Sequence, residues 1–173
     1  MTVLEKSVAK LQDELGEGFL KVAEFRGQTS LTLDRESIVQ ACQMLREDPE
    51  LDFNFLAALT AVDYWPSEPR FKIVYQLYSL ANKEFIELNV SLPGESAEIS
   101  TIERVYPNAN WHEREVFDMF GITFRDHSDP RRIIMPFDWE GHPLRKDYPL
   151  GYEEVQFTFN FDEIDKRKPY AKE

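Results

Sequence analysis

The sequence contains few residues of the kinds that build cofactor sites. Its single cysteine, Cys42, excludes an intramolecular disulfide and any iron–sulfur cluster or cysteine-rich zinc site made from this chain alone. Its seven glycines are spaced so that they form neither a GxGxxG dinucleotide turn nor a P-loop, and a GxSxG nucleophile elbow is absent. We therefore expect no nucleotide-binding loop in this chain, and we expect it to reside in a reducing compartment.

Positive charge and long apolar runs are also scarce. The 20 basic side chains are outnumbered by 32 acidic ones, and the net charge of −12 argues against nucleic-acid binding, which depends on Lys and Arg neutralising phosphates. No apolar run approaches the roughly 20 residues that span a bilayer. The amphipathic start has no signal-peptide character, so we expect it to be the mature N-terminus and expect any membrane contact to come through a partner.

The residues that are present predict one domain with a core, since 42% of them are hydrophobic. A first helix, ended by Gly16, is indicated by apolar residues at helical spacing: Leu4, Val8, Leu11 and Leu15. Asp34 is an expected N-cap of a second helix, which should stop before Asp48 because Pro49 disfavours the α region in the residue before it. Cys42 lies on the apolar face of that helix and is expected in the core.

Several segments have the patterns of β-strands. Residues 19–25 and 30–33 flank a short glycine-containing link and predict a hairpin. Residues 53–63 favour a short buried strand, with a helical turn as the alternative because of Ala57, Ala58 and Ala61. Apolar and polar side chains alternate along residues 70–80 and 84–92, which predicts an antiparallel pair. The predicted fold class is therefore α+β, with a mixed or antiparallel sheet flanked by helices.

A short helix rich in charged residues is predicted at residues 109–121. Asn108 or Asn110 can cap its start, and Gly121 can supply the left-handed residue that ends it. Within it, Glu113 and Glu115 are two positions apart and point in different directions, which argues against a catalytic carboxylate pair.

Other charged residues of this helix do share a face. Arg114 and Asp118 are four positions apart, and their simplest interpretation is a solvated ion pair worth only a few tenths of a kcal/mol. The basic residues that follow favour a second interpretation, in which these charges join an ion-pair network within the chain or between subunits.

Beyond residue 125 the chain changes character. Four prolines between residues 130 and 149 are too dense for a helix or a central strand, so we expect an extended, proline-rich arm. Residues 125–147 hold five basic and five acidic side chains, whereas residues 1–100 hold nine and seventeen. We therefore divide the chain into an α+β domain, residues 1–124, and a partner-docking arm, residues 125–173.

The three histidines, His112, His127 and His142, lie in separate segments, and the spacing of a zincin helix is absent. A metal site from these residues would have to be assembled by folding. A self-contained metal-dependent hydrolase using His112, Glu113 or His142 is thus the alternative of a different functional class.

Two segments resemble known signatures. Residues 112–122, His127 and residues 131–134 resemble the signature of the 30-kilodalton subunit of respiratory complex I, also called the C subunit or, in cyanobacteria, the J subunit. Residues 141–150 resemble the second hallmark of that family, and residues 59–64 are similar to a further family segment. Because the two hallmarks occur together over about 40 positions, the resemblance is more specific than a lone short motif.

The resemblance implies an α+β domain whose C-terminal arm docks on the 49-kilodalton subunit. It implies a place in the peripheral arm of a proton-translocating NADH:quinone oxidoreductase, on the cytoplasmic side of the bacterial cell membrane. It also implies that this chain holds no cofactor, since FMN and the iron–sulfur clusters belong to partner subunits. Equivalent subunits of ferredoxin-fed complexes and membrane-bound hydrogenases are the alternative within the same class.

The signature residues carry over as a structural and interface set with no catalytic member. The set consists of Glu113, Arg114, Glu115, Asp118, Arg131, Arg132, His142, Pro143, Arg145, Lys146, Asp147 and Tyr148.

Overall fold

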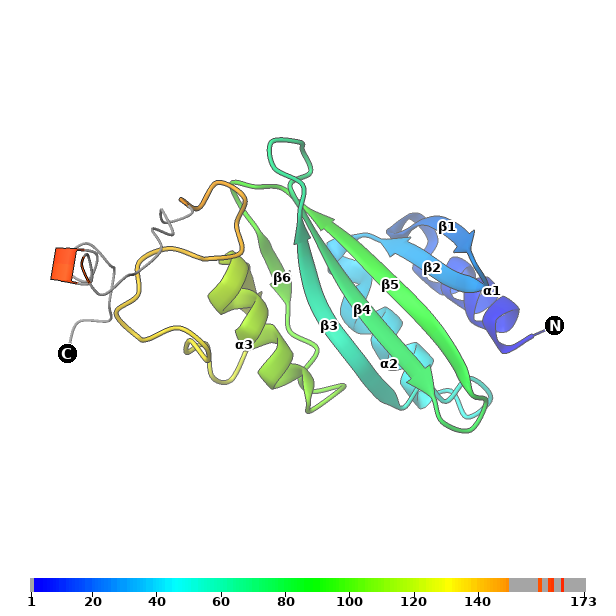
Figure 1. Cartoon of the computed structure of the whole chain (residues 1–173). Helices are drawn as coiled ribbons and strands as arrows, with labels where there is room; N and C mark the ends of the chain where they lie inside the picture. Colours follow the sequence, from blue (N-terminus) through cyan, green and yellow to red (C-terminus); the bar gives the residue numbers. More distant parts are fainter. Residues whose placement is uncertain (1, 150–158, 160–161, 164–165, 167–173) are drawn as a thin grey trace.

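A mixed five-stranded sheet forms the centre of the molecule in the computed structural model, which describes residues 2–149, 159, 162–163 and 166 (Figure 1). The elements in chain order are α1 (Val3–Leu15), the 3-10 turn η1 (Gly16–Gly18), β1 (Phe19–Phe25), β2 (Gln28–Leu33), the 3-10 turn η2 (Arg35–Ser37), α2 (Ile38–Glu47), β3 (Phe55–Asp63), β4 (Phe71–Ser79), β5 (Glu84–Leu92), β6 (Glu98–Ser100), α3 (Ala109–Phe120) and β7 (Thr123–Arg125). The predicted α+β class with a mixed sheet is confirmed.

The strands of the sheet lie in the order β1-β2-β5-β4-β3. After β2 the chain crosses through α2 to the far edge, and it returns strand by strand until β5 lies beside β2. The β2–β5 pair is parallel and the other three pairs are antiparallel. Both ends of the sheet are therefore edge strands, and α3 packs against the edge strand β3.

The core lies between the sheet and the helices α1 and α2, which Figure 1 shows behind the strands. The alternation in β4 and β5 produces it, because every second side chain points to the same face. These side chains have at most 1% of their surface exposed: Phe71, Ile73, Tyr75, Leu77, Ile86, Leu88, Val90 and Leu92. Leu11 of α1 and Cys42 of α2 join the same core, as the sequence predicts.

The predicted element ends are largely observed. Gly16 ends α1 with a φ of 52°, and α2 stops at Glu47, directly before Asp48. Asp34 accepts a hydrogen bond from the N–H of Glu36 and so caps η2, which leads into α2. The hairpin turn is shorter than predicted, because Gln28 already pairs with Phe25 as the first residue of β2.

The start of α3 differs from the prediction. Asn108 is its N-cap residue, but its side chain makes no cap and instead donates to the carbonyl of Leu56 at 2.9 Å. The amide of Asn110 donates to Glu103 and Ser128. Both amides are thus used in contacts with other segments, which outcompete the local cap.

Residues 126–149 contain no helix or strand and run along the side of α3 that faces away from the sheet (Figure 1). This agrees with the extended character that the prolines predict; the rest of the predicted arm lies outside the described residues apart from a few isolated positions. A parallel pairing of β6 with β7 precedes this segment and was not predicted, since three residues per strand are too few to show a pattern.

Candidate functional site

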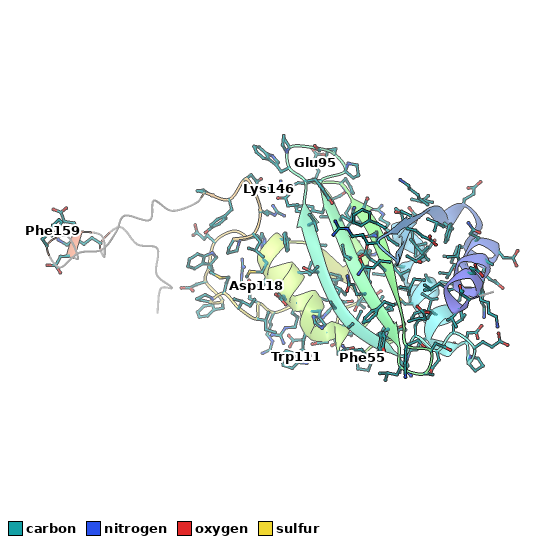
Figure 2. All side chains as sticks on the ribbon, turned by 45° about the vertical axis from the view of Figure 1, so that its right-hand side comes forward. Phe55, Glu95, Trp111, Asp118, Lys146 and Phe159 are labelled. Carbon is teal, nitrogen blue, oxygen red and sulfur yellow. The ribbon has the colours of Figure 1, made fainter. Side chains whose placement is uncertain are left out.

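Helix α3 and residues 126–149, hereafter the C-terminal segment, meet at a cluster of charged side chains. Figure 2 shows Asp118 on α3, with Lys146 at one end of the cluster near the loop of Glu95 and Trp111 at the other. Three buried carboxylates organise the region: Asp63 on β3, and Glu113 and Asp118 on α3. Each one binds a different stretch of chain.

Asp118 fixes the start of the C-terminal segment. One carboxylate oxygen, Oδ2, accepts hydrogen bonds from three successive backbone N–H groups, those of Ile133 at 3.1 Å and of Ile134 and Met135 at 2.8 Å. The other, Oδ1, accepts from Nη1 of Arg132 at 2.6 Å. Burial opposes ionisation, but the bonds from Met135 and Arg132 outweigh it and hold the pKa of Asp118 below its usual value. The charge is therefore retained inside the protein.

Arg114 contacts the same stretch from one turn earlier on the helix. Its guanidinium donates to the carbonyls of Arg131 and Arg132 at 3.0 and 3.2 Å, and lies 3.5 Å from Asp129. The solvated pair of Arg114 with Asp118, the simpler of the two interpretations, is therefore not the arrangement found. Each residue bonds to the C-terminal segment, because that segment offers several backbone donors and acceptors that a pair on one helix face lacks.

The C-terminal end of α3 is capped by the segment's polar groups. The last carbonyls of a helix lack intrahelical partners and carry partial negative charge. Arg145 donates from Nε to the carbonyl of Phe120 at 2.5 Å, the N–H of Leu144 donates to Met119, and Nδ1 of His142 lies 3.0 Å from the carbonyl of Asp118. These contacts place cationic and polar groups where the helix dipole favours them.

Gly121 makes this close approach possible. It has a φ of 73°, and a Cβ built at this position would lie 2.6 Å from the ring of His142 and 2.7 Å from Nη2 of Arg145. Glycine adopts this left-handed backbone conformation without strain, and it has no Cβ to collide with His142 and Arg145. The glycine is therefore needed both to end α3 and to receive the returning chain.

A second ion-pair group joins the end of the segment to the sheet. Arg70 forms two hydrogen bonds with Asp63, at 3.0 and 2.8 Å, and two with Asp147, at 2.9 and 2.6 Å. Asp63 also accepts from the N–H of Lys146. Burial opposes ionisation of Asp63, yet Arg70 and this N–H lower its pKa to about 2. The guanidinium of Arg70 lies over the ring of Phe71, at 4.8 Å from the centroid.

Glu113 behaves in the opposite way. It is fully buried, accepts from the hydroxyl of Thr101 at 2.5 Å and from the N–H of Ile102 at 2.8 Å, and lies 3.7 Å from Nε2 of His127. Burial is the largest influence and exceeds both hydrogen bonds, so the pKa of Glu113 rises to about 7. No arginine or lysine of the described residues forms an ion pair with it. This carboxyl group thus titrates near neutral pH.

The cluster joins separate segments of the chain through hydrogen bonds and ion pairs. In the described part of the chain, no group of three or more His, Cys, Asp or Glu residues is arranged to hold a metal ion. His127 and His142 each contact a backbone carbonyl, of Asn110 and Asp118 respectively. None of the described helices has the length and apolar character that crossing a membrane requires.

Comparison with known proteins shows which family the chain resembles. Residues 31–154 match the family described as "Respiratory-chain NADH dehydrogenase, 30 Kd subunit". The chain belongs to this family. It is 52% identical over 172 residues to the NADH-quinone oxidoreductase C subunit of Roseiflexus sp. (strain RS-1), covering 99% of this chain and 97% of that protein. It is 46% identical over 146 residues to the corresponding C subunit of Geobacter sulfurreducens, covering 84% and 89%.

Two solved structures share the fold of this 30-kilodalton family member. One, described as "Nqo5 of the trypsin-resistant fragment", has a TM-score of 0.64 and 29% identity, covering 74% of this chain and 99% of that fragment. A chain of an archaeal membrane-bound sulfane sulfur reductase has a TM-score of 0.70 at 19% identity, covering 98% and 95%. The second likeness shows the fold alone. The family and the relatives named as NADH-quinone oxidoreductase subunits support a subunit of a multi-subunit oxidoreductase.

Most of the signature residues bond within the chain. Those whose side chains join α3 and the sheet to the C-terminal segment are Arg114, Asp118, Arg132, His142, Arg145 and Asp147. Glu113 instead bonds the segment that precedes α3.

The remaining signature residues lie nearer the surface. Glu115 and Lys146 are exposed, Arg131 is exposed and pairs with Asp129, and Pro143 is half-buried. The hydroxyl of Tyr148 lies 3.4 Å from the carbonyl of Glu140. Whether a partner also contacts any of the twelve residues stays a prediction.

Asp63 and Arg70 were missed as site residues. Asp63 ends an apolar run and Arg70 begins an alternating strand, so each is at a strand end where a charge is unremarkable in a sequence. The one available signal was the likeness of residues 59–64 to a family segment.

Proposed function

We propose that this chain is a cofactor-free structural subunit in the peripheral arm of a proton-translocating NADH:quinone oxidoreductase. It docks on the 49-kilodalton-type subunit and so supports electron transfer from NADH, through FMN and iron–sulfur clusters of partner subunits, to quinone. It lies on the cytoplasmic side of the bacterial cell membrane and reaches the membrane only through the complex. Family membership and relatives named as NADH-quinone oxidoreductase subunits support this proposal.

The two-sided character of the C-terminal segment carries the docking proposal. Three of its charged side chains, Arg132, Arg145 and Asp147, bond inward to α3 and the sheet. Large apolar side chains remain exposed on it: Ile134, Phe137 and Leu144. A segment that bonds its charges inward and leaves apolar groups outward can bury those groups against a second protein without desolvating unpaired charges. Trp111 adds a further exposed aromatic side chain on α3.

Purification of the tagged subunit tests the docking partner. The tag is placed on the chromosomal copy, and membranes are solubilised in a mild detergent. We expect the 49-kilodalton-type subunit to co-purify, together with NADH:quinone reductase activity. Repeated recovery of the tagged chain without that subunit would reject the proposal.

Two further measurements test the cofactor and the electron donor. The purified chain should show no flavin fluorescence and should contain no iron in stoichiometric amounts. Detection of either flavin or iron would contradict a cofactor-free role. Membranes of a deletion strain should lose NADH-dependent quinone reduction and regain it on complementation. Unchanged NADH-dependent reduction would show that the complex takes its electrons from another donor.

A further inference from the structure

A surface turn in the C-terminal segment contains polar atoms that lack partners. Within the described residues, four buried side-chain atoms have no hydrogen bond: the hydroxyl oxygen of Tyr75, both carboxylate oxygens of Asp138 and Nε1 of Trp139. Three of the four thus belong to two neighbouring residues. An unpaired buried carboxylate costs more free energy than a hydrogen-bonded one, so the isolated chain is destabilised here.

The backbone of this turn is fixed. The N–H of Trp139 donates to the carbonyl of Pro136 at 3.1 Å, which closes a four-residue turn with Phe137 and Asp138 at its centre. The side chain of Phe137 is 90% exposed, while the carboxylate oxygens of its neighbour are inaccessible to solvent. An exposed aromatic ring and a half-buried acid with enclosed carboxylate oxygens therefore occupy adjacent positions on one hydrogen-bonded turn.

Three arginines of the C-terminal segment are bound elsewhere. Arg132 bonds to Asp118 and to the carbonyl of Gly141, and Arg145 bonds to the carbonyl of Phe120. Arg131 pairs with Asp129, and none of the ion pairs among the described residues includes Asp138. Among the described residues this carboxylate therefore has no paired cation, and a cation of a second protein can supply the compensating charge.

We propose that residues 136–139 are the anchor by which the subunit engages the 49-kilodalton-type partner, an inference that rests on the proposed function. Phe137 enters an apolar pocket of the partner. Asp138 turns outward by a change of rotamer, as interface side chains commonly do on binding, and pairs with an arginine of the partner. Arginine fits better than lysine because both oxygens of Asp138 lack donors, and a guanidinium supplies two parallel N–H groups.

Ile134 and Leu144 of the same segment are also exposed apolar side chains and could join this contact. A central aromatic group and a paired charge, surrounded by apolar contacts that exclude water, is the arrangement in which a few residues dominate the binding energy. An acceptor on the partner would also satisfy the indole N–H of Trp139. Binding then gives these unpaired groups hydrogen-bond partners. This lowers the free energy of the complex relative to that of the free subunit.

The test compares binding with stability for the full chain. Affinity for the purified 49-kilodalton-type subunit and the thermal midpoint of the free chain are measured for wild type, Asp138→Asn and Phe137→Ala. Phe25→Ala is the matched control, since Phe25 is 70% exposed on the hairpin and lies outside the C-terminal segment. We expect both anchor variants to bind about tenfold or more weakly. We expect the thermal midpoint to be unchanged or raised in Asp138→Asn and unchanged in Phe137→Ala.

The outcomes separate the two proposals. A wild-type chain that does not bind the 49-kilodalton-type subunit rejects the proposed function. A wild-type chain that binds, with both anchor variants binding equally well, rejects the anchor alone. A lower thermal midpoint for Asp138→Asn would also overturn it, because the carboxylate would then support the fold of the free chain. Equal losses in Phe25→Ala would show a general effect of removing an exposed ring and would likewise reject the anchor.

Discussion

Asp118 and Arg132 form an ion pair of 2.6 Å across fourteen positions of sequence, and this pair joins α3 to the C-terminal segment. The carboxylate of Asp118 is fully buried and also accepts three backbone N–H groups. A side chain on the helix thus supplies the acceptors that a segment without a helix or strand cannot supply for itself. Asp118 and Arg132, two of the charged signature residues, therefore bond within the subunit.

Replacing Asp118 should destabilise the isolated chain strongly. Asp118→Ala removes the carboxylate partner of Arg132 and the acceptor of three N–H groups, and breaking one partner of a buried pair costs about 3–5 kcal/mol. Urea unfolding measures the loss, and trypsin cleavage after Arg131 and Arg132 should accelerate. Glu115→Ala, on the exposed face of the same helix, should change stability by less than about 0.5 kcal/mol. A loss below about 1 kcal/mol for Asp118→Ala would contradict the role given to the pair.

Gly121→Ala should cost more than the same change at Gly27. Both glycines have positive φ, 73° and 78°, so alanine is strained at each by about 1–2 kcal/mol. At Gly27 the new methyl group meets nothing within 4 Å, whereas at Gly121 it collides with His142 and Arg145. We expect the collision to add about 1–3 kcal/mol, measured as the difference between the two variants in urea unfolding. Equal losses would show that the close approach at Gly121 has little energetic weight.

The sheet and its helices could be predicted because their patterns are local. The alternation in β4 and β5 and the helical spacing of Leu4, Val8, Leu11 and Leu15 follow directly from which face is buried. The parallel placement of β2 beside β5 could not be read in the same way. It depends on which strand fills the position beside β5, and that is decided by tertiary packing.

The sequence predicted most residues of the candidate site, but it did not predict which of them bond to one another. Sequence separation says nothing of whether Arg114 bonds to Asp118 on its own helix or to a segment that returns from far along the chain. The returning segment offers two backbone carbonyls, and Arg114 bonds to both of them. Asp63 and Arg70 were missed for the same reason, since they meet Asp147 only in the folded chain.

Acid should weaken the contact between the sheet and the C-terminal segment. The folded pKa of Asp63 is about 2, below its value in an unfolded chain, so its ionised form stabilises the fold above about pH 4. As pH falls from about 4 to 2 the unfolded state binds the proton first, and about 2 kcal/mol of this stability is lost. Urea midpoints at pH 7, 4 and 3 measure the loss. Asp63→Asn should be less stable at pH 7 and lose less between these pH values, and an unchanged slope would contradict the assignment.

Glu113 should produce the opposite dependence near neutral pH. Its folded pKa is about 7, above the unfolded value, so the folded chain keeps a proton that the unfolded chain releases between about pH 4.5 and 7. Its contribution to stability is full below that range and falls by at most about 3 kcal/mol as pH rises through it. Glu113→Gln keeps a side chain of similar size that does not ionise and that retains an acceptor for the N–H of Ile102, so it should remove most of this decline in urea unfolding between pH 5 and 8. Glu115→Gln, exposed on the same helix, should leave the decline intact, and a Glu113→Gln profile identical to wild type would show that the buried carboxyl does not titrate in this range.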